Sequence, residues 1–398
     1  MTKAVFGKQF ETPKMDYSQQ YSKIYSSRLT LLRPLLEVLI EKKYEGMSVQ
    51  TRLTNIPSGE TSLIGTIFKK SKKLPTVLAQ HKKDPKHIKI DFTQPPFHAD
   101  DDSAYLEDLI GHTDLVMKPE VLNTITSGTV IAVIGTINTE GFFNVTDVIF
   151  PYEEPIETTV MNCDATKNIT VISDIRFSAC KTDLMLYDVL KNKKIELGTD
   201  VFVIGNHYLE SMGSPLVDEY DGFLSEVSKG IPVTVIPEGD DPTNAVLPFQ
   251  PFHRAMFVKS MKNNTETQKS FNLVSNPSIV TLGDITIMFL SQEVFVRAMD
   301  LTILKTPQDV FCFFLKAGHL CPFAPSMFPC YPYEKDPFVL NEPFPDFFIV
   351  GGFEEMCYSV NFMGKTICLV TVPSFYKEKK FVVLNTDSHE NVVVDLNF

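Results

Sequence analysis

The sequence lacks the short motifs by which the commonest enzyme and metal sites are recognised. None of its seven cysteines belongs to a C-x-x-C pair, and structural zinc sites are usually built from such close pairs. A phosphate-binding glycine loop, a dinucleotide fingerprint, a serine–histidine–aspartate set and a cysteine–histidine set are also missing. We therefore expect no zinc site, and the odd number of scattered cysteines indicates reduced, buried thiols in a reducing compartment.

Long apolar segments and an excess of positive charge are missing as well. No apolar run approaches the roughly 20 residues of a membrane helix, and the N-terminus lacks the apolar segment of a signal peptide. We therefore expect a soluble, intracellular protein. The formal net charge is −12, which argues against a protein that coats nucleic acid by bulk electrostatics. A subunit of a nucleic-acid enzyme whose basic partner makes the contacts is compatible with that charge.

Proline and aromatic residues are concentrated in one stretch, residues 319–352. It holds seven prolines. Because proline removes a backbone donor and fixes its own backbone, this stretch cannot be a helix or a central strand. Its phenylalanines and tyrosines argue against disorder. We expect an ordered loop that lies against a surface and delivers a strand at residues 347–350 to a sheet.

Changes of pattern along the chain divide it into three regions. We predict an N-terminal helical segment at residues 1–46, a small barrel domain at 47–152 and a larger α/β domain at 153–398. Apolar residues at helical spacing predict a helix over residues 16–45 that caps the core. Pro34 interrupts that spacing, so we expect either a kinked helix or two helices that meet close to it.

The barrel is predicted from short apolar strands within about a hundred residues. We expect strands at residues 61–68, 128–137 and 141–150. Gly135 lies inside one of them, and a glycine within a strand suits the point where a small barrel bends, so we predict an OB-type barrel. The lysine-rich turn at residues 69–73 could touch nucleic acid, but in an acidic chain we interpret it as a solvated loop.

The C-terminal region alternates apolar strands with helical stretches, which is typical of a layered α/β sheet. Five strands are expected, each ending in small or polar residues, at 169–173, 200–204, 231–236, 285–290 and 347–350. Chemistry gathers at the carboxyl ends of the strands in such sheets. The predicted fold is thus mixed, α+β or α/β, with an N-terminal helical segment, an OB-fold barrel and a two-layered sheet with flanking helices.

The strand order and the position of the polar residues resemble the calcineurin-like phosphoesterase family. Such enzymes hold two metal ions between roughly seven aspartate, histidine and asparagine ligands. Asp174 is present, but Arg176 stands where a histidine is needed. Arginine has no acceptor to offer a metal, and we expect it to pair with Asp174. The other strand ends also depart from the pattern. The bridging aspartate is replaced by Asn206, and the third motif contains no histidine (Glu238, Gly239, Asp240 and Asp241). The last motif, which should hold two histidines, reads Gly351, Gly352, Phe353 and Glu354.

We therefore predict no catalytic residue, no cofactor-binding residue, no cofactor and no metal site. His207 follows Asn206 in a G-N-H run typical of phosphoesterases, but its place in the chain is that of a carboxylate ligand. His253 and His319 flank proline-rich turns, and we interpret them as structural. An active phosphodiesterase or exonuclease is the less favoured alternative, because the substitutions remove most of the metal ligands.

Several groups of residues form a further pattern that runs through nearly the whole chain. They are residues 21–25 with 28–29 and 33–35, 101–102 with 106–108, 127–130 with Gly135, 241–244 with 247–248 and 250–253, 274–277, 319–320 with 322, 324–325, 330–333 and 336–338, and 369–373. Together they resemble the B-subunits of the replicative DNA polymerases and, within that family, the delta branch. Four residues differ from the family pattern: Gly318, Phe323, Ser326 and Glu238. These differences bear on the details of how the protein would contact its partners.

The resemblance implies a non-catalytic scaffold subunit that serves DNA replication in the nucleus. It implies binding to the C-terminal metal-binding domain of the polymerase delta catalytic subunit and, on another face, to a third subunit. Contact with the sliding clamp and with primer–template DNA would be indirect, and no membrane contact is expected. B-subunits of polymerases alpha and epsilon share the architecture and are the alternative. Tyr331, Phe338, Phe344 and Phe347 are candidate interface anchors, and each is equally well explained as core.

Overall fold

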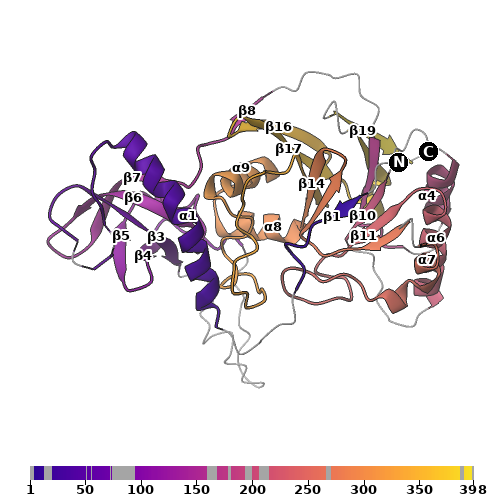
Figure 1. Cartoon of the computed structure of the whole chain (residues 1–398), viewed down its shortest axis with the longest axis horizontal. Helices are drawn as coiled ribbons and strands as arrows, with labels where there is room; N and C mark the ends of the chain where they lie inside the picture. Colours follow the sequence, from indigo (N-terminus) through magenta and orange to yellow (C-terminus); the bar gives the residue numbers. More distant parts are fainter. Residues whose placement is uncertain are drawn as a thin grey trace.

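The computed structural model describes residues 4–12, 20–50, 52–54, 56–71, 73, 95–158, 168–177, 181–192, 200–205, 215–265, 270–385 and 390–396. Figure 1 shows a small barrel at one end of the molecule, with helix α1 beside it, and two larger sheets with their helices at the other end. The mixed fold predicted from the sequence is thus confirmed. Within the described ranges, no helix is long and apolar enough to cross a membrane.

Helix α1 (Ser22–Lys43) packs on the barrel through one apolar face. Its buried side chains recur at helical spacing: Ile24, Leu29, Leu32, Leu36 and Ile40. The helix continues unbroken through Pro34, so the alternative of two separate helices is excluded, and the kink at Pro34 stays a prediction. Apolar contacts on both sides of the proline hold the two halves together despite the missing backbone donor. Residues 16–19 of the predicted helix lie outside the described residues.

The barrel sheet has the strand order β2-β3-β4-β5-β7-β6, and an additional pairing of β3 with β6 closes it. Its strands are β2 (Val49–Gln50), β3 (Thr61–Lys70), β4 (Ser103–Glu107), β5 (His112–Val116), β6 (Val130–Ile137) and β7 (Phe143–Ile149), with α3 (Pro119–Leu122) between β5 and β6. The ladder between β6 and β7 shifts register at Gly135, where a Cβ would overlap the carbonyl oxygen of Asn144. The glycine therefore allows the bend that was predicted for it.

Two barrel features differ from the expectation. Strands β4 and β5 were missed, because five-residue strands with only two buried positions give a weak apolar signal. Lys69 and Lys70 end strand β3 rather than forming a solvated turn. The Lys69 ammonium donates to Asn123 Oδ1 at 3.3 Å, and burial lowers the pKa of Lys69 to about 8.

The C-terminal region contains two sheets that pack face to face. One has the order β12-β11-β10-β9-β18-β19, and the other β1-β13-β14-β15-β17-β16-β8. The first contains β9 (Asn168–Ser173), β10 (Val201–Ile204), β11 (Val233–Ile236), β12 (Phe271–Leu273), β18 (Lys380–Asn385) and β19 (Glu390–Asp395). The second contains β1 (Val5–Phe6), β8 (Ile156–Glu157), β13 (Ser278–Leu282), β14 (Ile285–Leu290), β15 (Phe347–Gly351), β16 (Met356–Phe362) and β17 (Lys365–Val372).

The five strands expected from the sequence are divided between these sheets. Strands β9, β10 and β11 are parallel neighbours in one sheet, and β14 and β15 are parallel neighbours in the other. Phe202 and Phe289 face each other across the interior, with ring centroids 4.8 Å apart. Strand β1 lies inside the predicted segment 1–46 but pairs with β13. The domain boundaries at 46 and 152 stay a prediction.

Helices cover the outer faces of both sheets (Figure 1). The first sheet is covered by α4 (Lys181–Asn192), α6 (Pro215–Ser228) and α7 (Val258–Met261), with the 3-10 turn η1 (Arg254–Met256) before α7. The second is covered by α8 (Gln292–Leu301) and α9 (Pro307–Ala317), and α10 (Phe375–Glu378) follows β17. A capping box of Thr306 and Asp309 begins α9, and Gly318 in the left-handed conformation ends it.

The proline-rich stretch is ordered, as predicted, and most of its aromatic side chains are buried in the core beneath α8 and α9. Residues 318–346, all of them described, form no helix and only isolated bridges, including His319 with Val339. The stretch then enters the second sheet as β15. Phe338, Phe344 and Phe347 are at most 4% exposed, so these three belong to the core and are not interface anchors. Tyr331 is half-buried.

A buried arginine joins helix α1, the barrel and the proline-rich stretch. The guanidinium of Arg28 is fully buried and donates from Nε to Asp336 Oδ2 at 2.8 Å. It also donates to the backbone oxygens of Gly128, Pro322 and Ala324, at 2.7, 2.5 and 2.9 Å. An ion pair without water is favourable only when such hydrogen bonds satisfy the remaining donors.

Two neighbours complete this buried ion pair. His319 Nδ1 accepts from the backbone N–H of Cys321, so its Nε2–H donates to Asp336 Oδ2 at 3.0 Å. Burial and the nearby Arg28 lower the pKa of His319 to about 4, and the imidazole is neutral. At Gly128, φ is 87° and a Cβ would overlap the oxygen of Pro322. Only glycine therefore lets the barrel approach the proline-rich stretch this closely.

We predict that Arg28→Ala lowers the free energy of unfolding by about 3–5 kcal/mol, because it leaves the Asp336 carboxylate buried without its partner. Denaturant unfolding followed by circular dichroism measures the change. Lys42→Ala is the matched control on the same helix. Its ion pair with Glu153 joins side chains that are 71% and 65% exposed, so its loss should cost less than about 1 kcal/mol. Equal losses in the two variants would contradict the prediction.

Candidate active site at the strand ends

The carboxylate of Asp174, just after β9, is fully engaged by groups of the protein itself. Arg176 Nε donates to its Oδ1 at 2.7 Å, and Ser374 Oγ donates to its Oδ2 at 2.5 Å. Its backbone N–H donates to Ile204, and its carbonyl accepts from Tyr376, both at 3.0 Å. Asp174 is 4% exposed and has a φ of 52°. The residue is thus held in a rare conformation by contacts on every side.

Arg176 pairs with Asp174, as the sequence predicted. Its guanidinium also lies over the ring of Tyr376, 5.0 Å from the centroid. The hydrogen bond to Asp174 raises the pKa of Arg176 above its ordinary value. The cation stands beside the aspartate where a metal ion would need an acceptor.

Asn206, His207 and Tyr208 lie outside the described residues. The interpretation of Asn206 as a lost bridging ligand, and of His207 as a residue that does not bind metal, therefore stays a prediction.

Glu238, at the end of β11, is buried between the two sheets. Its Oε1 accepts from the backbone N–H of Gln292 at 2.9 Å and from Asn276 Nδ2 at 3.1 Å. Its Oε2 lies 2.6 Å from Ser291 Oγ. Burial raises the pKa of Glu238 to about 8, since the charged form is poorly solvated. A neutral carboxyl group at this position joins β11 to the start of α8.

Side chains also fill the space next to the glycines at the strand ends. A Cβ at Gly205 would overlap Glu238, one at Gly351 would overlap Ser173 Oγ, and one at Gly352 would overlap the amide of Gln292. Gln292 Nε2 donates to the Gly352 carbonyl at 3.1 Å. The glycines thus allow protein atoms to close the region where the phosphoesterase pattern requires metal ions.

The remaining carboxylates of this region do not converge. Asp241 Oδ2 accepts from the backbone N–H of Glu238 at 2.9 Å, which shapes the turn after β11. Asp240 is exposed, and Glu293 has a pKa raised first by burial and then by Asp240. Across the described ranges, no three histidine, cysteine, aspartate or glutamate side chains are grouped so that they could hold a metal ion.

The two histidines interpreted as structural both make local hydrogen bonds. His253 Nδ1 accepts from the backbone N–H of Ala255 at 3.2 Å and caps η1. His319 belongs to the buried ion pair of Arg28 and Asp336. Neither imidazole lies free beside a cluster of carboxylates.

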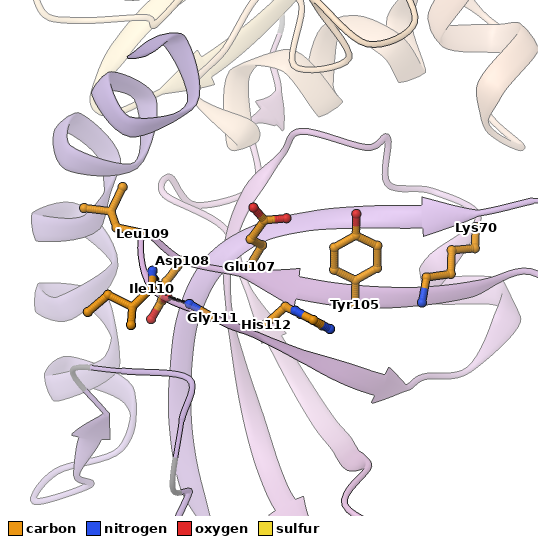
Figure 2. A pocket seen from close by; sticks show the side chains of 8 residues that line it. All are labelled: Lys70, Tyr105, Glu107, Asp108, Leu109, Ile110, Gly111 and His112. Carbon is orange, nitrogen blue, oxygen red and sulfur yellow. Dashed lines mark hydrogen bonds between the residues drawn. The ribbon is translucent and has the colours of Figure 1, made fainter. Parts of the chain in front are cut away.

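A second candidate site, which the sequence did not reveal, is a depression of about 440 Å³ on the barrel (Figure 2). It lies over the β4–β5 hairpin and is lined by Lys70, Tyr105, Glu107, Asp108, Leu109, Ile110, Gly111 and His112. Its floor is aromatic: the Tyr105 ring stacks on Phe68 with centroids 5.5 Å apart and meets His112 edge-on at 5.6 Å. The sequence did not predict this depression, because it did not predict strands β4 and β5, which form it.

The charge of this depression disfavours phosphate. Lys70 Nζ lies 4.8 Å from the Tyr105 ring centroid and 3.3 Å from Asp114 Oδ1, so it is already paired. Glu107 and Asp108 add negative charge to the lining. The depression therefore suits a neutral or cationic group better than a nucleic-acid backbone.

Comparison with known proteins assigns the chain to a family. Residues 20–148 match the family described as the DNA polymerase delta subunit OB-fold domain. Residues 210–358 match the family described as the B subunit of DNA polymerases alpha and epsilon. These matches together span more than half of the chain. The chain belongs to the B-subunits of the replicative DNA polymerases, and the predicted family is confirmed.

Curated relatives then indicate the branch within that family. DNA polymerase delta subunit 2 of Drosophila melanogaster is 27% identical over 412 residues, which cover 94% of this chain and 92% of the relative. The DNA polymerase delta small subunits of Oryza sativa subsp. japonica and Saccharomyces cerevisiae are 27% and 24% identical, over 92% and 96% of this chain and 90% and 91% of the relatives. All three are delta subunits, which agrees with the sequence motifs.

A crystal structure, that of TT1561 of Thermus thermophilus, covers 58% of this chain at 12% identity, and this chain covers 100% of it. Its TM-score of 0.31 is too low to add to the fold described from the sheets.

We predict that the folded protein becomes less stable relative to its Glu238→Gln variant as the pH rises from about 5 to about 8.5. Because the pKa of Glu238 is raised from 4.5 to about 8, the folded state binds more protons than the unfolded state between these values. Stability contributed by the neutral carboxyl group is therefore lost as the pH rises through the folded pKa. Glutamine is neutral at both pH values and therefore lacks this titration.

Urea unfolding of both proteins at about pH 5.5 and about pH 8.5 measures this difference. The control is Glu41→Gln, which neutralises an exposed carboxylate and should give the same difference at both pH values. An unchanged difference for Glu238→Gln would show that the carboxyl group is already ionised in the folded protein.

Proposed function

We propose that this chain is the non-catalytic accessory subunit of a nuclear DNA polymerase delta complex, in which it bridges the catalytic subunit and a third subunit. The observation that carries the proposal is similarity to delta small subunits over 92–96% of the chain and 90–92% of those relatives. Similarity of that extent reaches beyond one shared domain. It includes both the barrel and the two sheets.

The strand ends support the non-catalytic part of the proposal. Two-metal hydrolysis needs converging carboxylates and histidines with free acceptor atoms. Here the Asp174 carboxylate is engaged by Arg176 and Ser374, and the Glu238 carboxyl group is buried among hydrogen-bond donors. Asp174 thereby ties the end of β9 to the start of α10, and Glu238 ties the end of β11 to the start of α8.

The rigid joining of the barrel to the sheets supports a scaffold role. A scaffold binds with less ordering cost when its surface is already stiff, and the Arg28–Asp336 ion pair holds three regions in one arrangement. The partners we propose are the C-terminal metal-binding domain of the catalytic subunit and the third subunit. Action with the sliding clamp and primer–template DNA would then be indirect.

We expect this chain to co-purify with the C-terminal domain of the polymerase delta catalytic subunit of its own organism. Co-expression with the corresponding domains of polymerases epsilon and alpha provides the comparison, and neither should be retained. Retention by epsilon or alpha alone would favour the alternative assignment within the family. Recovery with none of the three would contradict the scaffold proposal.

We also expect the purified chain to show no manganese-dependent cleavage of phosphodiester substrates. Cleavage that Asp174→Ala abolishes would establish an active phosphodiesterase instead. Ser374→Ala is the matched control, since it removes the hydroxyl that engages Asp174 but leaves the carboxylate in place.

A further inference from the structure

Two cysteine thiols meet on neighbouring strands of the second sheet. Strands β16 and β17 are antiparallel, with Cys357 opposite Val370 and Cys368 opposite Ser359. The two cysteines therefore lie diagonally across the ladder, close enough for their side chains to meet. Their Sγ atoms are 3.0 Å apart, and one thiol donates a hydrogen bond to the other.

The two thiols differ in their access to solvent. Cys357 is half-buried, whereas Cys368 is fully buried. The hydrogen bond with Cys357 and burial raise the pKa of Cys368 above its ordinary value. An oxidant from solvent would thus reach Cys357 first, and Cys368 would act second. By contrast, half-buried Cys312 contacts the hydroxyl group of Tyr358, at 3.9 Å, rather than another thiol.

We propose that Cys357 and Cys368 form an oxidative modification site that closes into an intramolecular disulfide when the protein meets a peroxide. In the first step, Cys357 Sγ attacks one peroxide oxygen, the O–O bond breaks, and a sulfenic acid and one water form. In the second step, Cys368 Sγ attacks Cys357 Sγ, the S–O bond breaks, and a second water leaves. Two thiols and one hydrogen peroxide thus give one disulfide and two waters.

Closure would tie β16 to β17, next to the segment that leaves the barrel. Strand β16 pairs with β17 on one side and with β8 on the other. Strand β8 belongs to the segment that leaves the barrel, and the N–H of Thr158 in that segment donates to Ser359 at 3.0 Å. The disulfide encloses ten residues, 358–367. Restricting the unfolded chain in this way stabilises the folded protein.

Peptide mapping tests the proposal directly on the unmodified chain. The native protein is treated with hydrogen peroxide, remaining thiols are alkylated, and trypsin digestion follows without reductant. Cleavage after Lys335, Lys365 and Lys377 separates peptides 336–365 and 366–377, each with a single cysteine. We expect these two peptides to be joined, with a mass about 2 Da below their sum, and to separate on reduction. Thermal unfolding should shift upward by about 2 °C or more on oxidation.

Two variants distinguish this site from general oxidation. Cys357→Ser should lose both the joined peptides and the upward shift, whereas Cys312→Ser should keep both. Joined peptides in denatured protein but not in native protein would overturn the proposal. So would oxidation of Cys357 to a sulfinic acid while peptide 366–377 keeps a free thiol. Both readouts on unmodified protein remain decisive if a variant fails to fold.

Discussion

The arrangement of this protein depends on a guanidinium and a carboxylate that meet without water. Arg28 comes from helix α1 and Asp336 from the proline-rich stretch, and both side chains are fully buried. Removing two such charges from water costs several kcal/mol per ion, so the pair is favourable only with the further hydrogen bonds to Gly128, Pro322 and Ala324. Those acceptors belong to the barrel edge and the proline-rich stretch. Arg28 therefore joins the helix, the barrel and the proline-rich stretch through one side chain.

Contacts within the protein also fill the carboxyl ends of β9, β11 and β15. In a two-metal enzyme, carboxylates and imidazoles converge on ions that carry positive charge into the interior. Here Arg176 provides the cation beside Asp174, and burial raises the pKa of Glu238 to about 8. Glycines at 205, 351 and 352 bring backbone and side chains together where ions would have to fit. Hydrogen bonds within the protein thereby tie the ends of β9 and β11 to neighbouring segments.

The parts of the fold that the sequence predicted well are those controlled by local pattern. Strands β9, β10, β11, β14 and β15 are continuous apolar runs bounded by small residues, and each was expected. The pairing of Arg176 with Asp174 was also predictable, because two residues at one strand end must lie close together. Strands β4 and β5 were missed, because alternation over five residues is a weak signal, and with them the depression around Tyr105. Two layers were predicted, but not which of the five strands belong to which sheet, since pairing is chosen by contacts between distant segments.

By itself, the sequence determined the family, the OB-type barrel and the order of the apolar strands, because residue identity and short-range spacing carry each of these. Only the tertiary structure decided the surroundings of Glu238, since burial raises its pKa and its donors Ser291 and Gln292 lie far from it in the chain. It also decided that Phe338, Phe344 and Phe347 are core. The tertiary structure likewise brings together the Arg28–Asp336 pair and the Cys357–Cys368 pair. Partners separated by 308 residues, or across a ladder, meet only when the register of the whole sheet and the path of the whole chain are set.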